Sequence, residues 1–203
     1  MGTSKENIAV IDFLDPTAKE RLFSSLKNTG FAVFKNHPLD LDLIDNVYTT
    51  WIDTFKTQQL SFFDFDEKNF DGFVDENVSE IAKGYNIKDL KTFYNYYPWG
   101  KCPSQLKKMT DQYFQQIVEF GLTIAKWLYE LTPRDNLPLE SQSFTNNIMN
   151  SNRNLLRINY FPAIKDDAPK GAIRAQAHTD INFFTLIPRT SSPGLQVQHK
   201  NGH

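Results

Sequence analysis

The segment Ala175-Gln-Ala-His-Thr-Asp-Ile-Asn-Phe-Phe-Thr-Leu-Ile187 decides which fold this chain is expected to adopt. At its centre is the tripeptide His178-Thr179-Asp180. On an extended backbone alternate side chains point to the same face, so His178 and Asp180 are predicted to share one face and Thr179 to point away. One imidazole nitrogen and one carboxylate oxygen on a common face are two of the three ligands of a metal-binding facial triad. We therefore predict that His178 and Asp180 are metal ligands.

A histidine and an aspartate at this spacing also occur by chance, since the chain has four histidines and 24 acidic residues. The simpler interpretation is a His–Asp pair in which the two side chains bond to each other at the end of a strand. The apolar side chains that follow, Phe183, Phe184 and Leu186, favour a strand edge where a rigid sheet would hold metal ligands in place. The spacing alone leaves both interpretations open.

Short apolar runs surround the motif, and turn-forming residues such as Ser191-Ser-Pro-Gly194 separate them. These runs are typical of strands, and they lie at 155–161, 172–178, 183–187 and 195–198. A strand pattern that begins near Leu155, after a largely helical first part, predicts an α+β protein with a mainly antiparallel sheet.

The first part of the chain has the pattern of helices with two short strands. From Ser104 to Leu131 apolar residues recur at steps of three and four, which predicts one long helix with a buried stripe. Asp15 and Pro16 favour the start of an earlier helix, and Gly30 favours its end. The other expected elements are strands at 8–13 and 31–34 and helices at 39–60 and 139–149, with mostly irregular structure over 61–103.

Composition excludes several classes of protein. The 203 residues are 40% hydrophobic and 23% charged, which is typical of a globular chain. A net charge of −2 argues against a nucleic-acid-binding surface, and no apolar run is long enough to span a membrane. The N-terminus lacks the apolar core of a signal peptide, and the single cysteine, Cys102, rules out an internal disulfide and is expected to be an idle thiol. These features favour a cytoplasmic protein.

The wider sequence resembles a known enzyme family. Leu155-Leu-Arg-Ile-Asn-Tyr-Phe-Pro162, the His178 motif and Pro193-Gly-Leu-Gln-Val197 follow one another as in the isopenicillin N synthase-like family of 2-oxoglutarate- and Fe(II)-dependent oxygenases. Upstream, Gly30-Phe-Ala-Val-Phe-Lys-Asn-His37 and Asp89-Leu-Lys-Thr-Phe93 also resemble that family. The resemblance covers nearly the whole chain and implies a double-stranded β-helix, or jelly roll, with a helical N-terminal portion. It implies an N-terminal dioxygenase-type domain, a long supporting helix with a connector, and the first jelly-roll strands, at 1–103, 104–150 and 151–203 respectively.

The resemblance implies roles for four residues near the metal. His178 and Asp180 would bind Fe(II), which leaves room for 2-oxoglutarate and O₂ as cosubstrates. Asn159 matches a family residue that lies near the 2-oxoglutarate. Phe161 occupies a position at which many relatives have a tyrosine that bonds to the cosubstrate, and its ring has no hydroxyl group to make that bond.

The resemblance also suggests where a substrate would bind. Tyr94, Tyr96 and Phe183 are expected to contact a small-molecule substrate, and no nucleic acid or membrane is expected as a partner. The sequence does not indicate an oligomeric state.

One departure from the family pattern concerns the third iron ligand. In the family a second histidine, and then an arginine that binds the far carboxylate of 2-oxoglutarate, come well beyond the aspartate. Neither His199 nor His203 matches the position of that second histidine. The chain is therefore expected to be a C-terminally truncated oxygenase with an incomplete roll, which on its own would be poorly soluble, bind Fe(II) weakly and show no turnover.

Three functions remain open from the sequence. The first is an oxygenase that uses Fe(II), O₂ and 2-oxoglutarate to hydroxylate, desaturate or cyclise a small molecule. The second is an iron oxidase of the same fold that does not use 2-oxoglutarate, and Phe161 favours it slightly. The third is a catalytically inactive truncated product that acts as an interaction module.

Overall fold

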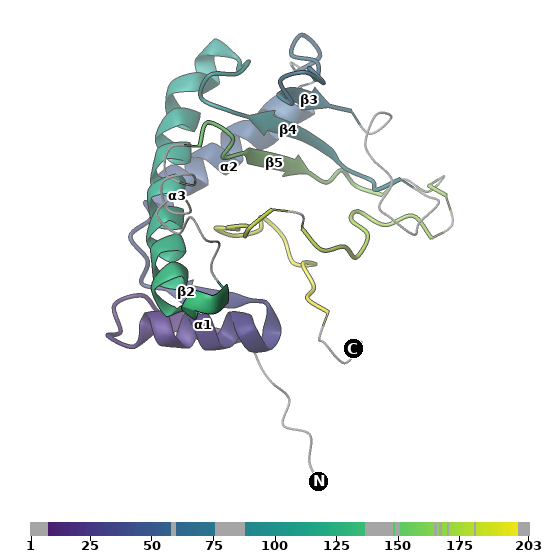
Figure 1. The fold of residues 1–203 in the computed structure, drawn as a ribbon. Coiled ribbons are helices and arrows are strands. Elements are labelled where there is room, and N and C mark those ends of the chain that lie inside the picture. Colours follow the sequence, from purple (N-terminus) through teal and green to yellow (C-terminus); the bar gives the residue numbers. More distant parts are fainter. Residues whose placement is uncertain are drawn as a thin grey trace. The chain divides into compact units, whose positions relative to one another are not determined.

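The computed structural model describes residues 8–57, 60–75, 88–136, 148, 151–164, 166, 168–169, 171–180 and 182–198. Helices and strands are mixed along the chain, which confirms the α+β expectation (Figure 1). In chain order the elements are β1 (Ala9–Asp12), α1 (Ala18–Thr29), β2 (Ala32–Lys35), α2 (Leu41–Lys56), β3 (Gly72–Val74), β4 (Thr92–Tyr96), α3 (Ser104–Leu131), the 3-10 turn η1 (Arg134–Asn136) and β5 (Leu156–Tyr160).

The chain forms two compact units, each built from separate stretches of sequence. The first comprises residues 1–40, 116–151 and 192–203, and the second comprises 41–115 and 152–191. The boundary falls inside α3, whose residues 104–115 belong to the second unit. The domain boundaries expected from the sequence stay a prediction.

The first unit contains a parallel pair of strands, β1 and β2, connected by α1. It contains an aromatic cluster, in which the ring of Phe13 stacks on Trp127 with centroids 5.1 Å apart and lies 5.3 Å from Phe120, and its most deeply buried side chains include Ile11 and Leu22. Gly30 ends α1 in the left-handed conformation, at φ 81°, as predicted. The expected start at Asp15 is wrong, because the Asp15 carboxylate accepts hydrogen bonds from the backbone N–H and hydroxyl of Thr17 and so forms a turn before the helix.

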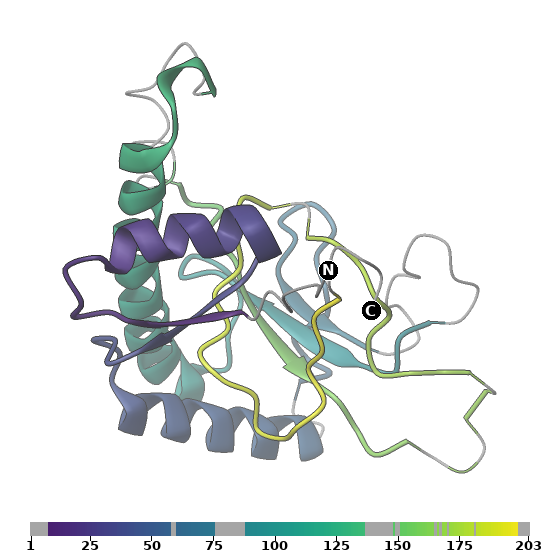
Figure 2. The same ribbon diagram turned by 90° about the horizontal axis from the view of Figure 1, so that it is seen from below.

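The second unit contains the antiparallel sheet β3-β4-β5 with α2 against it (Figures 1 and 2). Phe55 of α2 stacks on Tyr160 of β5 with centroids 5.2 Å apart and planes 8° apart. Trp51, one turn earlier, lies 5.0 Å from the ring of Tyr94 and donates a hydrogen bond to the Thr110 hydroxyl at 3.1 Å. The apolar stripe of α2 therefore buries one face of the sheet.

The predicted bounds of two elements agree with the structure and those of a third do not. The long helix, α3, has the predicted bounds, and β5 confirms the strand expected at 155–161. Helix α2 is shorter than the predicted 39–60. The helix expected at 139–149 lies outside the described residues except for Ile148.

The runs 172–178, 183–187 and 195–198 are not strands, which corrects the expectation. A strand needs a ladder of backbone partners. In the described part of the chain, the backbone hydrogen bond that connects these runs to another segment is the one from Leu90 N to Ile173 O, at 3.0 Å.

Among the described helices, none is both long enough and apolar enough to cross a bilayer.

Candidate metal site

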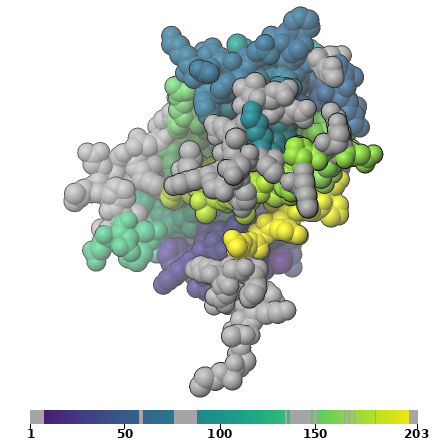
Figure 3. Space-filling view, turned by 90° about the vertical axis from the view of Figure 1, so that its right-hand side faces the viewer, coloured from purple at the N-terminus to yellow at the C-terminus, as the bar shows by residue number. Residues whose placement is uncertain are grey.

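His178 and Asp180 point toward each other from an irregular segment at the surface of the second unit. The Nε2 atom of His178 lies 3.7 Å from Oδ1 of Asp180, and both side chains are about half exposed, at 51% and 48%. The yellow-green part of the chain that contains them is visible at the surface in the space-filling view (Figure 3). Because water reaches both groups, their orientation depends on hydrogen bonds more than on packing.

A backbone carbonyl group orients the imidazole of His178. Its Nδ1 atom lies 2.7 Å from the carbonyl oxygen of Gln176. A carbonyl oxygen only accepts hydrogen bonds, so this contact requires a proton on Nδ1, and in the neutral imidazole Nε2 then carries the lone pair. Metal-binding histidines commonly donate their second ring N–H to a carbonyl or carboxylate in this way. The tautomer of His178 is therefore one that presents Nε2 as a ligand.

The carboxylate of Asp180 is held by a hydroxyl group that the sequence did not single out. Thr185 donates a short hydrogen bond to Oδ2 of Asp180, and Asn182 in turn donates to the Thr185 hydroxyl at 3.0 Å. Because Oδ2 is engaged, Oδ1 is the oxygen that faces His178. The signal that could have revealed this residue is a lone hydroxyl five residues after Asp180 in an otherwise apolar run.

This donor set fits a first-row divalent metal. Bonds of about 2.0–2.2 Å from a metal to imidazole nitrogen or carboxylate oxygen would let one ion contact both atoms across their 3.7 Å separation. Among the residues that the structure describes, no group of three or more His, Cys, Asp or Glu forms a complete site. His199 and His203 lie outside those residues.

The segment before the motif is tied to the beginning of β4. The buried carboxylate of Asp89 accepts a hydrogen bond from Gln176 N at 2.9 Å, and Leu90 N donates to Ile173 O at 3.0 Å. These bonds place the motif beside the sheet, although Asp89 and Gln176 are 87 positions apart in the sequence.

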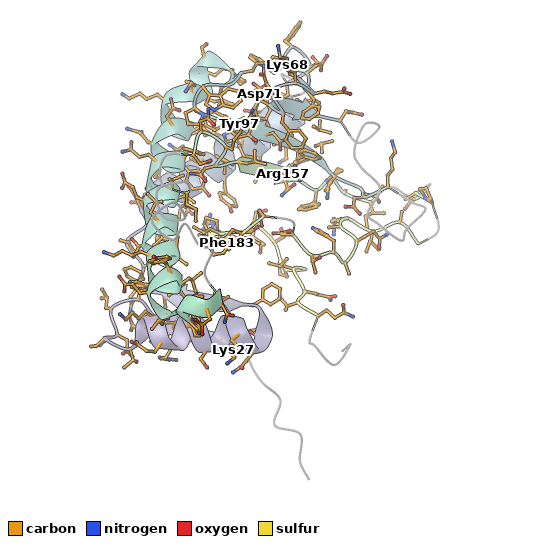
Figure 4. The ribbon with its side chains drawn as sticks, viewed as in Figure 1. Lys27, Lys68, Asp71, Tyr97, Arg157 and Phe183 are labelled. Carbon is orange, nitrogen blue, oxygen red and sulfur yellow. The ribbon has the colours of Figure 1, made fainter. Side chains whose placement is uncertain are left out.

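Asn159 lies on β5, and Phe161 follows the end of that strand, so the two side chains are expected on the same side of the extended segment. Asn159 is opposite Phe93 of β4 in the strand register and is exposed, and Phe161 is 42% exposed. Arg157 shares this face: its Nε donates to the Asn95 side chain at 3.0 Å, and its guanidinium lies 4.5 Å from the ring of Phe93. Figure 4 shows Arg157 on strand β5 of the sheet and Phe183 on the segment that follows His178-Thr179-Asp180.

Tyr94 and Tyr96 lie on the opposite face of β4 from Phe93, which is the face that Trp51 covers. Both are fully buried, and burial raises the pKa of each hydroxyl. The Tyr94 hydroxyl donates to Lys101 O at 2.9 Å, and the Tyr96 hydroxyl donates to the Asp111 carboxylate. Their substrate contacts stay a prediction, but their hydroxyl groups are engaged inside the fold.

Phe183 is exposed, whereas Cys102 is partly buried. Phe183 is 58% exposed and its ring lies 5.4 Å from that of Phe184. Burial raises the pKa of the Cys102 thiol to about 12, so the thiolate is scarce at neutral pH and Cys102 is a poor nucleophile.

The chain is similar in sequence and in fold to several known proteins. The chain is 36% identical to a proposed oxygenase from Shewanella oneidensis, with a TM-score of 0.79 over 96% of this chain and 70% of that one. It is 27% identical to a proline hydroxylase of Petromyces alliaceus over 98% of this chain and 69% of the relative. A Neurospora crassa protein solved in complex with alpha-KG and thymine shares the fold at 17% identity, with a TM-score of 0.61 over 88% of this chain and 64% of that one.

No protein-family model matches the chain. It spans between 40% and 69% of the length of the curated relatives that it matches. At 36% identity over 70% of its length, the Shewanella oneidensis protein is a homologue of this chain. The chain belongs to the isopenicillin N synthase-like family of 2-oxoglutarate- and Fe(II)-dependent oxygenases.

Proposed function

We propose that this protein is an oxygenase that uses Fe(II), O₂ and 2-oxoglutarate to hydroxylate, desaturate or cyclise a small molecule. The observation that carries the proposal is the pair His178 Nε2 and Asp180 Oδ1, 3.7 Å apart and each oriented by a hydrogen bond at its other atom. When bound, Fe(II) with 2-oxoglutarate would activate O₂ for the oxidation of a substrate C–H bond.

The cosubstrate would lie along the exposed face of β5. Asn159 offers an amide group there, and Phe161 offers an apolar ring two residues later on the same face. Phe161 would shield the cosubstrate from water without hydrogen bonding to it. We further propose that residues 151–203 are the first part of a jelly roll, which the antiparallel pairing of β4 with β5 and the similarity to the Shewanella oneidensis protein support.

The substrate would be a small molecule, as the name of the proline hydroxylase and the thymine bound to the Neurospora crassa protein suggest for those relatives. Phe183 is the most accessible of the three candidate contacts, at 58% exposed. Tyr94 and Tyr96 would support the substrate site from inside the fold, because both side chains are fully buried and their hydroxyl groups bond within it.

Anaerobic calorimetric titration of Fe(II) into the 203-residue chain tests the metal site. We expect His178→Ala and Asp180→Ala each to weaken binding by at least about tenfold, because each removes a ligand. Thr179→Ala is the matched control, since a side chain between two residues that share a face is expected to point away from both, and it should bind like the parent. Equal Fe(II) affinity in all four proteins would contradict the proposal.

The second candidate, an iron oxidase that does not use 2-oxoglutarate, is favoured by Phe161. A titration of 2-oxoglutarate into the Fe(II)-loaded protein separates the two. Binding that strengthens in Phe161→Tyr, which restores a hydroxyl, supports the 2-oxoglutarate-dependent enzyme, and no 2-oxoglutarate binding in either protein supports the oxidase. Absence of both Fe(II) and 2-oxoglutarate binding supports the inactive interaction module. Stoichiometric decarboxylation of 2-oxoglutarate by the 203-residue chain would support the 2-oxoglutarate-dependent enzyme over both alternatives.

A further inference from the structure

The carboxylate of Asp89 is the most deeply buried acidic group in contact with the metal-site segment. Asp89 is 3% exposed, and it lies three residues before β4. Its Oδ1 accepts a hydrogen bond from Gln176 N at 2.9 Å, and its Oδ2 forms an ion pair with Lys91 Nζ at 2.7 Å. A buried carboxylate with both oxygens engaged has a fixed position, because any rotation would leave a charged oxygen unpaired.

The residue that Asp89 holds is the one that orients His178. Gln176 is 7% exposed, whereas the residues on either side of it are exposed. Its N–H is bonded to Asp89, and its carbonyl oxygen accepts the hydrogen bond from His178 Nδ1 at 2.7 Å. Gln176 is therefore the anchored point from which the imidazole is positioned, and the bond from Leu90 N to Ile173 O restrains the backbone on the side before it.

We propose that Asp89 is a positioning residue for His178: through Gln176 it holds the imidazole with the proton on Nδ1 and with Nε2 directed at Asp180. This inference rests on the proposed function, because only a metal ligand needs a fixed Nε2. The orientation of His178 itself can be measured in the metal-free chain. His178 is half exposed and would otherwise sample other rotamers and the alternative tautomer. Loss of a group bonded directly to a metal ligand, as the Gln176 carbonyl is to His178, typically changes metal affinity by about 10–100-fold; Asp89 acts one bond further away, so an effect at the lower end of that range is expected.

Asp71 provides a matched control, because it makes the same kind of bond away from the motif. Asp71 is 2% exposed, and its Oδ2 accepts a hydrogen bond from Lys101 N at 2.6 Å. Figure 4 shows Asp71 beside β3 and apart from Phe183, which follows the motif. Removal of the Asp71 carboxylate would thus test the general cost of losing a buried carboxylate–amide bond.

The experiment combines two readouts on the parent chain, Asp89→Ala, Asp89→Asn and Asp71→Ala. Long-range ¹H–¹⁵N NMR of ¹⁵N-histidine-labelled, metal-free protein reports which ring nitrogen of His178 carries the proton, with His178→Gln used to assign the signal. Calorimetry with Co(II), a redox-stable substitute for Fe(II), reports affinity. We expect Asp89→Ala to lose the predominance of the Nδ1–H form and to bind Co(II) about tenfold more weakly.

Asp89→Asn keeps an acceptor oxygen for Gln176 N and should retain the parent tautomer, with Co(II) affinity within about twofold. Asp71→Ala should retain both. A parent-like His178 tautomer in Asp89→Ala, or an equal loss of the tautomer in Asp71→Ala, would overturn the proposal. If the parent shows the predicted tautomer and Asp89→Ala loses it, but no protein binds Co(II), the positioning role stands and the proposed function fails.

Discussion

His178 Nδ1 donates a hydrogen bond to the carbonyl oxygen of Gln176 at 2.7 Å. This bond links a half-exposed side chain to the backbone of Gln176, a buried residue between exposed neighbours, and it turns the other ring nitrogen toward Asp180. The simple interpretation of the tripeptide, a His–Asp pair that satisfies itself, predicts a direct hydrogen bond between the two side chains. The 3.7 Å separation is too long for such a bond, so both groups have capacity left for a shared ligand.

Thr185→Val should weaken the metal site without unfolding the protein. Valine keeps the shape of threonine but removes the hydroxyl that donates to Asp180 Oδ2, so the carboxylate becomes free to rotate. We expect about a tenfold loss of Co(II) affinity by calorimetry. Thr179→Val removes a neighbouring hydroxyl that is expected to point away from the pair, and it should have no effect. Equal affinities in the two variants would refute the role of Thr185.

Phe55→Ala should destabilise the second unit strongly. The ring of Phe55 is 9% exposed and stacks on Tyr160, so its loss leaves a cavity between α2 and the sheet. We expect the free energy of unfolding to fall by about 3–5 kcal/mol, measured by urea denaturation. Phe62→Ala is the control, because Phe62 is 90% exposed and its removal should cost less than about 0.5 kcal/mol.

Gly72→Ala should cost more than Gly30→Ala, although both glycines have positive φ angles. At Gly72 (φ 105°) a Cβ atom would lie 2.6 Å from Phe63 O and 2.7 Å from Asp64 O, so the backbone would have to move. At Gly30 (φ 81°) a Cβ atom meets nothing within 4 Å, and only the left-handed conformation costs energy, about 1 kcal/mol. Thermal unfolding should show a clearly larger loss for Gly72→Ala, and equal losses would contradict this account.

Cys102 should be almost unreactive in the folded protein. Burial raises its pKa to about 12, so less thiolate is present at pH 8 than in the unfolded chain, where the pKa is near 9. We expect alkylation by iodoacetamide at pH 8 to be at least about a hundredfold slower in buffer than in urea, because the thiolate is the nucleophile. Similar rates in both conditions would show that Cys102 is accessible and ordinary.

The same raised pKa has a consequence for stability. A group that binds its proton more tightly in the folded state stabilises the fold fully below the unfolded pKa, near 9, and this stabilisation is lost as the pH rises toward 12. The pH at which Cys102→Ser and the parent diverge in unfolding free energy should therefore lie above 9. A divergence confined to acidic pH would contradict the assignment.

Much of the local structure could be read from the sequence, because it depends on contacts within a few residues. The apolar stripe of α3 defined a helix whose bounds, Ser104–Leu131, agree with the structure. Gly30 was recognisable as a helix end because a left-handed residue is needed there. The start of α1 could not be read, because the Asp15 carboxylate can cap either a turn or a helix and the two alternatives are similar in energy.

The candidate site was readable only in part. The spacing of His178 and Asp180, together with the motifs on either side, was sufficient to indicate an iron-dependent oxygenase. The faces of β4 were not predicted. Tyr94 lies against Trp51 of α2 and Tyr96 lies against Phe114 of α3, whereas Phe93, on the other face, is opposite Asn159. A shift of one residue in register would have exchanged the two faces.

By itself the sequence determined the family, the long helix α3 and the choice of His178 and Asp180 as candidate ligands, since these follow from residue identity and short spacings. Tertiary structure decided how the ligands are held. Asp89 and Gln176 are bonded although 87 positions separate them, and no local pattern connects a carboxylate before β4 with a backbone amide beside the motif. The physical reason is that a buried charge must find a partner wherever the fold supplies one, and that partner is specified by the path of the whole chain and not by its neighbours in sequence.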